Sequence, residues 1–191
     1  MDKIKILALF GKSGAGKDYM ANWILNKYPN LTNRIVRHTT REKRANEWNK
    51  VDYHFIPVKK FTGMVLNNKF IEAECFNDWF YGTSFSSLDK KRLNIGCYSI
   101  NAIETLLSDN RLEVLPVYIK SLDRVRLLRS LNRDPLCDCS EICRRFLADE
   151  KDFGEGLDFP FHYCTYYNDE NLVTDIKSVK EVREFLNKVK L

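Results

Sequence analysis

The chain has 191 residues, of which 44% are hydrophobic and 30% are charged, and its formal net charge is +5. This length suits one compact domain with a substantial core. No apolar stretch is long enough to span a membrane, no signal-peptide pattern opens the sequence, and no basic run is typical of a nucleic-acid-binding arm. We therefore expect a cytoplasmic protein with reduced cysteines, and with no membrane and no nucleic acid among its partners.

The first predicted element is an apolar strand at Ile4–Phe10, and a helix is expected at Lys17–Lys27. The residues between them follow G-x-x-x-x-G-K, the pattern of a phosphate-binding loop that joins a strand to a helix. Glycines let backbone N–H groups surround phosphate oxygens, and the lysine reaches the terminal phosphates of a nucleotide. The predicted nucleotide phosphate site therefore consists of Gly11, Lys12, Ser13, Gly14, Ala15, Gly16 and Lys17.

The residue after this lysine departs from the pattern. Asp18 stands where a serine or threonine usually holds a magnesium ion. Its carboxylate can bind the metal, although it also repels phosphate. Alternatively, the charge of Asp18 stabilises the positive end of the helix that it begins. Asp18 is therefore a candidate magnesium ligand within the ATP site, with helix capping as the alternative.

The sequence pattern changes between residues 35 and 83. Short aromatic and β-branched runs predict strands at Val51–Val58, Phe70–Phe76 and Trp79–Thr83, and a helix-like piece at Lys59–Asn67 interrupts them. This pattern favours a small mixed sheet inserted into a larger α/β body.

The rest of the chain alternates strand and helix signals, which predicts a parallel sheet covered by helices. Ser140 is expected to cap its helix. The expected strands are Leu93–Cys97, Glu113–Ile119 and His162–Tyr167. The expected helices are Ile100–Leu107, Leu122–Asn132, Ser140–Asp152 and Ser178–Val189.

Three of the six cysteines cluster, at Cys137, Cys139 and Cys143. A zinc site would need a fourth ligand and a more regular pairing. Ordinary cysteines in a loop and at a helix start are the favoured interpretation.

Arginines recur after the phosphate loop, in the groups Arg41 and Arg44, Arg129 and Arg133, and Arg144 and Arg145. A planar guanidinium suits phosphate because it donates two parallel hydrogen bonds. For the helical arginines, a solvated helix face is the alternative interpretation. Pro135 ends the helix that carries Arg133, which favours a hinged lid over the phosphate loop.

The order and spacing of five motifs resemble the guanylate kinase family over most of the chain. Besides the phosphate loop, the motifs are Thr39-Thr40-Arg41 with Arg44 and Glu47, Val51-Asp52-Tyr53-His54-Phe55, Phe70-Ile71-Glu72, and Phe80-Tyr81-Gly82-Thr83. Asn168-Asp169 near the end also fits.

The resemblance implies a role for each matching residue on the acceptor side. Glu72 would accept hydrogen bonds from the adjacent N–H groups of guanine, and Thr83 would donate to the guanine carbonyl. Adenine would leave that carboxylate unpaired, at a cost of about 1–3 kcal/mol. The residues implied for the GMP phosphate are Arg41, Arg44, Tyr53 and Tyr81.

On the donor side, the resemblance implies that arginines contact ATP and the transferring phosphate. The matching residues are Lys17, Arg129, Arg133 and Arg145, with Arg144 as the alternative to Arg145, and Arg41 completes the implied catalytic set. Asn168 would contact the adenine base, or else it is a turn residue.

Two further positions differ from the family pattern. The family usually has Asp-x-Asp where this chain has Cys97-Tyr98-Ser99, and a serine near guanine where this chain has Arg37. Together with Asp18, these differences lie around the metal and the base, so they bear on metal binding and on strict GMP specificity.

The resemblance implies a P-loop α/β fold of the nucleoside monophosphate kinase type. A parallel sheet flanked by helices would carry an inserted small mixed-sheet nucleotide-binding subdomain and a helical lid. The single domain would span 1–191, with a core at 1–33, 93–133 and 153–191, an insert at 34–92 and a lid at 134–152.

The implied activity is phosphoryl transfer from ATP, with magnesium, to GMP or dGMP. One alternative is a kinase of the same fold that acts on another nucleotide or on a sugar phosphate. The other alternative is a guanylate-kinase-like binding domain with weak or lost catalysis.

Overall fold

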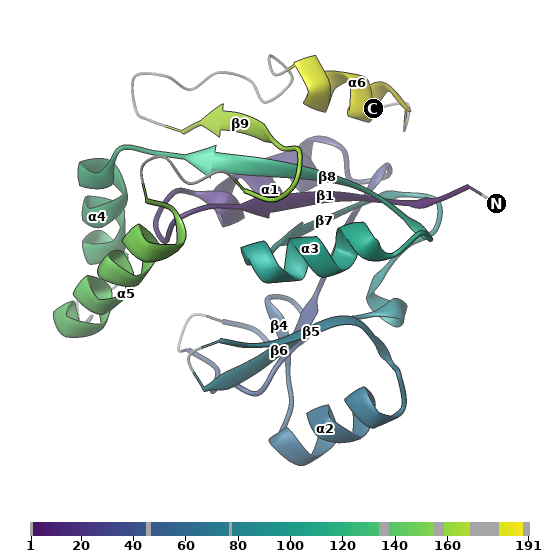
Figure 1. Ribbon diagram of the computed structural model, residues 1–191, viewed down its shortest axis with the longest axis horizontal. Helices are drawn as coiled ribbons and strands as arrows, with labels where there is room; N and C mark the ends of the chain where they lie inside the picture. Colours follow the sequence, from purple (N-terminus) through teal and green to yellow (C-terminus); the bar gives the residue numbers. More distant parts are fainter. Residues whose placement is uncertain are drawn as a thin grey trace.

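A parallel sheet of five strands forms the centre of the computed structural model, which describes residues 2–44, 47–76, 78–133, 138–154, 159–168 and 180–188. The strand order is β2-β7-β1-β8-β9, and every neighbouring pair is parallel (Figure 1). In that order the strands are Thr32–Arg34, Leu93–Cys97, Ile4–Phe10, Leu112–Lys120 and Cys164–Tyr167.

The central strand β1 is apolar at nearly every position because both faces of the sheet are covered. Leu7 and Leu9 face a core formed with helices α1 (Lys17–Lys27) and α6 (Lys180–Lys188). The alternate residues of β1 face a second core under helix α3 (Ile100–Ser108). These two layers fix the carboxyl end of β1, where the glycine-rich loop begins.

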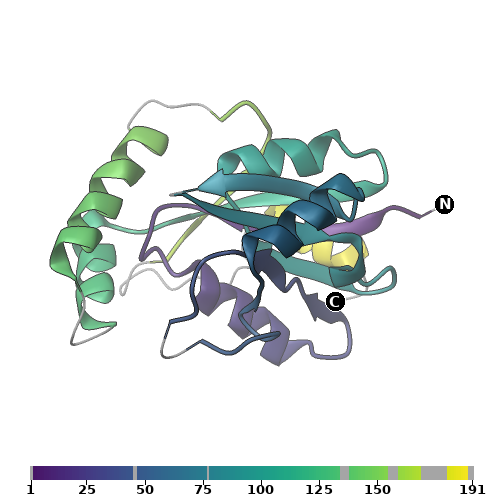
Figure 2. The ribbon, with the colours of Figure 1, turned by 90° about the horizontal axis from the view of Figure 1, so that it is seen from below.

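A second, four-stranded sheet lies beside the first, with the order β4-β3-β6-β5 (Figures 1 and 2). Its strands are Tyr53–Phe55, Arg37–Thr39, Trp79–Ser84 and Phe70–Phe76 in that order. Strands β3 and β4 run parallel, and the other pairs run antiparallel. Helix α2 (Val58–Leu66) covers this sheet by burying Phe61, whose ring stacks on Phe70 and Phe80. A short 3-10 turn at Phe85–Ser87 follows β6.

Helices α4 (Asp123–Asn132) and α5 (Cys139–Asp152) pack against each other at one end of the molecule (Figure 1). Arg126 on α4 holds them together, because its guanidinium lies over the Phe146 ring and pairs with Asp149 and Glu150 on α5. Residues 134–137 of the predicted lid lie outside the described part of the chain.

The structure confirms the predicted fold class, a parallel sheet flanked by helices with a smaller mixed sheet. Three predictions of detail were wrong. The strand expected at His162–Tyr167 begins only at Cys164, and the run Val51–Val58 forms a strand only at Tyr53–Phe55. Asp138 caps α5 through the backbone N–H of Ser140, so Ser140 is not the cap.

Two short strands were not predicted individually. They are β2 and β3, whose three residues each carry too little periodicity to be recognised. Of the helix expected at Ser178–Val189, the described residues form a helix at Lys180–Lys188. Among the helices of the described ranges, none has both the length and the hydropathy to cross a membrane.

Candidate functional site

The loop between β1 and α1 has the backbone geometry of an anion-binding turn. Gly14 and Gly16 adopt positive φ angles of 76° and 95°. A Cβ atom at Gly16 would lie 2.1 Å from the side-chain nitrogen of Asn168, so only glycine fits there. The ammonium of Lys17 lies over this loop and donates to the carbonyl oxygens of Gly11 and Lys12 at 2.7 and 3.1 Å.

Asn168 supports the phosphate loop through a hydrogen bond to the loop backbone. Its side-chain amide donates to the carbonyl oxygen of Ala15 at 2.8 Å, and the residue is buried. Arg129 on α4 donates to the backbone carbonyl oxygen of Asn168 at 3.0 Å. The geometry therefore gives Asn168 a structural role in shaping the loop, while its contact with adenine stays a prediction.

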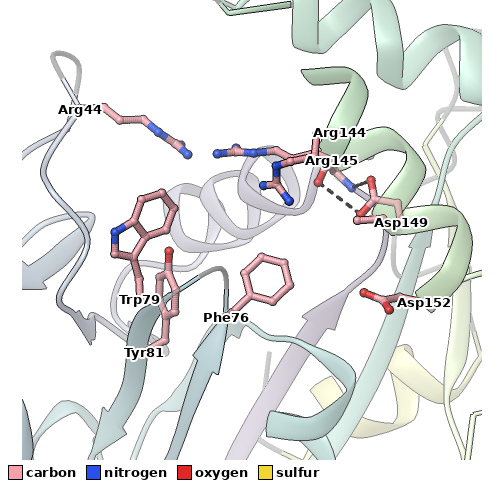
Figure 3. A pocket seen from close by; sticks show the side chains of 10 residues that line it. Arg44, Phe76, Trp79, Tyr81, Arg144, Arg145, Asp149 and Asp152 are labelled. Carbon is pink, nitrogen blue, oxygen red and sulfur yellow. Dashed lines mark hydrogen bonds between the residues drawn. The ribbon is translucent and has the colours of Figure 1, made fainter. Parts of the chain in front are cut away.

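Two carboxylates of α5 bind the loop where nucleotide phosphate is expected. Asp149 accepts a hydrogen bond from the backbone N–H of Ser13 at 2.8 Å (Figure 3). Glu150 accepts two from the ammonium of Lys12, both at 2.8 Å. Burial raises the pKa of Asp149, against the lowering effect of the Ser13 N–H. A phosphate group that binds to this N–H must displace Asp149.

The contact between Asp149 and Ser13 leads to a prediction about ATP affinity. Asp149→Asn removes a negative charge that competes with phosphate for the Ser13 N–H, so the Kd for ATP should fall by about 3- to 10-fold. Isothermal titration calorimetry of ATP measures it. The matched control is Asp152→Asn, one turn along the same helix and at the same pocket. Equal ATP affinity in both variants and the wild type would contradict the prediction.

The residues expected to hold the acceptor phosphate lie together on the small sheet and the loop after it. Arg41 is buried and donates to both carboxylate oxygens of Glu47, at 2.7 and 2.9 Å. The backbone N–H of Arg44 donates to Glu47 at 2.9 Å. Tyr53 lies beside both Arg41 and Tyr81, with its ring 5.6 Å from the Arg41 guanidinium and 6.0 Å from the Tyr81 ring.

An arginine of the loop after β3 and two arginines of α5 approach one another across a pocket. Figure 3 shows Arg44 reaching toward Arg144 and Arg145 above Tyr81, and all four line the same pocket. The pKa of Arg44 is lowered, first by burial and then by the charges of Arg41, Arg145 and Arg133. Arg44, Arg144 and Arg145 therefore line one pocket together with Ser13 of the phosphate loop, an arrangement that favours an anion.

Arg144 and Arg145 share one counter-ion. Glu141 accepts hydrogen bonds from the Nε atoms of both, at 2.7 and 2.6 Å, and these bonds contribute to lowering its pKa to about 2. The structure therefore places both arginines at the pocket and does not choose between them. Arg133 is exposed at the end of α4, close enough for its charge to reach Arg44.

The two residues expected to read the base are cross-strand partners on β5 and β6 of the small sheet, and both are buried. Glu72 is 2% exposed and Thr83 is fully buried. Arg37 holds the Glu72 carboxylate through Nε and Nη2, at 3.1 and 3.0 Å. The pKa of Arg37 is raised, because attraction to Glu72, Tyr98 and Glu74 outweighs the opposing effect of burial.

The two unusual residues around the expected metal position are neighbours. The thiol of Cys97, at the end of β7, lies 3.6 Å from a carboxylate oxygen of the exposed Asp18. Burial and the Asp18 charge raise the pKa of Cys97, so its thiol keeps its proton and is a poor ligand for magnesium. Magnesium prefers oxygen and is often held by one carboxylate together with water and nucleotide phosphates. Asp18 fits that role and Cys97 does not.

This geometry leads to a coupling prediction. If Asp18 supports the metal, Asp18→Ser should raise the magnesium concentration for half-maximal turnover by about 10-fold. Cys97→Asp should restore part of that loss, because it returns a carboxylate to the same place, so the two changes would not be additive. If Asp18 only stabilises the start of α1, Asp18→Ser should lower the free energy of unfolding by about 0.3–1 kcal/mol and leave the magnesium dependence of turnover unchanged. Magnesium titrations and melting curves of both single variants and the double variant distinguish the two.

Sequence reasoning missed several charged residues of this site. Arg126 is 1% exposed and links α4 to α5, and Glu74 pairs with Arg37 at 3.0 Å. The spacing of Asp123 and Arg126 is visible as a helical pair in the sequence. Nothing in the local pattern indicates the partners on α5.

Comparisons with known proteins place the chain in a family. The family model described as "Guanylate kinase" matches residues 3–186. The chain is 28% identical to a guanylate kinase of Prochlorococcus marinus over 180 residues, which cover 92% of this chain and 97% of the relative. The structure resembles the crystal structure of guanylate kinase from Anaplasma phagocytophilum, with a TM-score of 0.63 and 20% identity, covering 100% of this chain and 87% of the other.

Other relatives match over part of their length. A guanylate kinase of Schizosaccharomyces pombe is 35% identical over 88 residues, which are 46% of this chain and 44% of the relative. Human Disks large homolog 3 is 31% identical over 147 residues, which are 74% of this chain but 18% of that protein. The family match, which extends over nearly the whole chain, decides the assignment: the chain belongs to the guanylate kinase family.

Proposed function

We propose that this protein transfers the γ-phosphoryl group of ATP to a nucleoside monophosphate, with GMP and dGMP as the first candidates, and so acts in purine nucleotide metabolism. The observation that carries the proposal is one pocket that is lined both by Ser13 of the phosphate loop and by Arg44, Arg144 and Arg145. This pocket lies between the loop expected to hold the donor phosphates and side chains expected to hold the acceptor phosphate. Two phosphate sites that face each other are what a direct transfer requires.

In this mechanism, an oxygen of the acceptor phosphate attacks the γ-phosphorus, and the bond from phosphorus to the β–γ bridging oxygen breaks, leaving ADP. Lys17 and the loop N–H groups hold the donor phosphates. Arg41, Arg44 and the two tyrosines hold the acceptor in line. Arginines of α4 and α5 stabilise the charge on the transferring oxygens. Magnesium, when bound with ATP beside Asp18, would neutralise charge on the donor phosphates.

The test is a coupled assay of ADP release with ATP, magnesium and each nucleoside monophosphate in turn, with ribose 5-phosphate as a sugar phosphate. We expect turnover with GMP and dGMP well above the background hydrolysis of ATP. Faster turnover with ribose 5-phosphate than with any nucleotide would favour the other kinase alternative.

A binding domain without turnover is the second candidate. The observation in its favour is the pair of carboxylates on the phosphate loop, Asp149 and Glu150. Calorimetry distinguishes the candidates, because a domain that has lost catalysis through a closed loop should bind no ATP. The complete phosphate loop and the arginine set favour the kinase.

A further inference from the structure

A buried network of three charged side chains lies beside Tyr81, a residue that lines the pocket. Arg37 donates from Nη2 to Glu72 and to Glu74, at 3.0 Å each, and from Nε to Glu72 at 3.1 Å. The hydroxyl of Ser99 donates to the other carboxylate oxygen of Glu74. The side chains of Arg37, Glu72 and Glu74 are 8%, 1% and 15% exposed.

Within this network, Glu72 is the counter-ion of Arg37. Both of its oxygens accept from the guanidinium, and Thr83, itself buried, also donates to it. A ligand that took this carboxylate from Arg37 would break a buried ion pair, which is costly. Glu72 is therefore poorly placed to read a base in competition with Arg37.

Two groups of this network keep unused hydrogen-bonding capacity, one as a donor and one as an acceptor. Among the described residues, the Nη1 nitrogen of Arg37 makes a single long contact, 3.5 Å to the carbonyl oxygen of Cys97 at the end of β7. The carboxylate of Glu74 is the more exposed of the two acids and keeps lone pairs beyond those used by Arg37 and Ser99. Tyr81 of the phosphate-binding set lies 5.8 Å from the Arg37 guanidinium, so this pair borders the acceptor site.

The charge of the network argues against a second phosphate group beside it. One guanidinium stands against two carboxylates, so the net charge is negative when both acids are ionised. A neutral ring is compatible with such a site, whereas another phosphate is repelled. The acceptor that fits has a phosphate at the arginine cluster and an uncharged base at Arg37 and Glu74.

We propose that Arg37 and Glu74 form the base-reading pair of this protein and that they admit several nucleobases instead of guanine alone. A lone carboxylate accepts hydrogen bonds only, so it selects the adjacent N–H groups of guanine. A donor beside an acceptor matches an edge that every base offers: N1 and the amino group of adenine, N3 and the amino group of cytosine, O6 and N1–H of guanine, O4 and N3–H of thymine or uracil. This inference rests on the proposed function and names the substrate class of the same site.

The first test compares acceptors on the wild-type protein. We expect kcat/KM values for GMP, AMP, CMP and dTMP to lie within about 10-fold of one another. Calorimetric Kd values for the same monophosphates, measured without ATP, should show the same narrow range. A preference of 100-fold or more for a single base in both measurements overturns the inference and leaves the proposed function standing.

The calorimetric Kd values also distinguish failure of the proposed function from failure of the base-reading inference. If no monophosphate is phosphorylated but all four bind with similar Kd values, the proposed function is wrong and the base-reading inference holds. If none of them binds, both are wrong.

The second test removes the arginine. Arg37→Ser frees the Glu72 carboxylate for guanine, so the GMP-to-AMP ratio of kcat/KM should rise by at least 10-fold. The matched control is Arg111→Ser, an arginine paired with a carboxylate, Asp109, at the amino end of β8, away from the pocket. An unchanged ratio in a folded Arg37→Ser variant contradicts the inference.

A third measurement applies even if Arg37→Ser fails to fold. Glu74→Gln should weaken binding of all four monophosphates by about 3- to 10-fold while leaving that of ribose 5-phosphate, which has no base, unchanged. Glu72→Gln should lower thermal stability and leave the ratios between bases as in the wild type. A specific loss of GMP binding in Glu72→Gln would return the base-reading role to Glu72.

Discussion

Lys17→Met is expected to reduce kcat by about 100- to 1000-fold, the effect of removing one preorganised donor from a transition state that carries developing charge. The ammonium of Lys17 lies over the phosphate loop, 2.7 Å from the carbonyl oxygen of Gly11. Methionine keeps the length of the apolar stem and removes only the charge. Single-turnover kinetics with ATP and GMP measure the chemical step directly.

The acceptor site provides the control for this prediction. Lys17 serves the donor phosphates, so GMP should bind to the variant with a Kd within about twofold of the wild type. Melting curves show whether loss of the bonds to Gly11 and Lys12 loosens the loop. A variant that turns over at the wild-type rate would remove Lys17 from the catalytic set.

Arg41→Ala is expected to weaken GMP binding by about 10- to 150-fold, because charge-assisted hydrogen bonds to phosphate contribute about 1.5–3 kcal/mol. It also leaves the buried carboxylate of Glu47 without its bidentate partner, although the backbone N–H of Arg44 still donates to it. The free energy of unfolding should therefore fall by about 1–3 kcal/mol. Calorimetry and urea denaturation measure the two effects separately.

Arg44→Ala is the matched control for this double effect. The Arg44 side chain is 41% exposed and lies 3.7 Å from Glu47, so its loss should weaken GMP binding with little change in stability. Arg41→Ala combined with Glu47→Gln should recover part of the stability and none of the binding, because the buried charge is removed. Wild-type GMP affinity in both single variants would exclude Arg41 and Arg44 from the phosphate site.

Local patterns predicted most of the secondary structure. The apolar strand Ile4–Phe10, the glycine-rich turn and the helix Lys17–Lys27 each depend on neighbouring residues, and the structure has all three with the predicted bounds. Short elements escaped prediction, because three residues at β2 or β3 cannot display a period. Those strands are defined by hydrogen bonds to β7 and β6, which are distant in sequence.

The candidate site likewise has features that local patterns predicted and features that they did not. Spacing in the sequence predicted a phosphate loop and a set of phosphate-binding arginines, since both signals are local or helical. The sequence also marked Arg37, Asp18 and Cys97 as unusual. It did not reveal that Cys97 donates to Asp18, or that Glu74 shares Arg37 with Glu72, because these contacts join separate strands and loops.

By itself, the sequence determined the strand, the glycine-rich turn and the helix around the predicted phosphate site, because backbone geometry and hydrophobic periodicity depend on residues close together in the chain. Only the tertiary structure decided which partner each charged side chain has. Asp149 accepts a hydrogen bond from Ser13, which is 136 positions away in the chain, and Arg37 pairs with Glu72, which is 35 positions away. Buried charges pair with whatever partner the packing brings within hydrogen-bonding distance, so the identity of each partner is a property of the fold and not of any local segment.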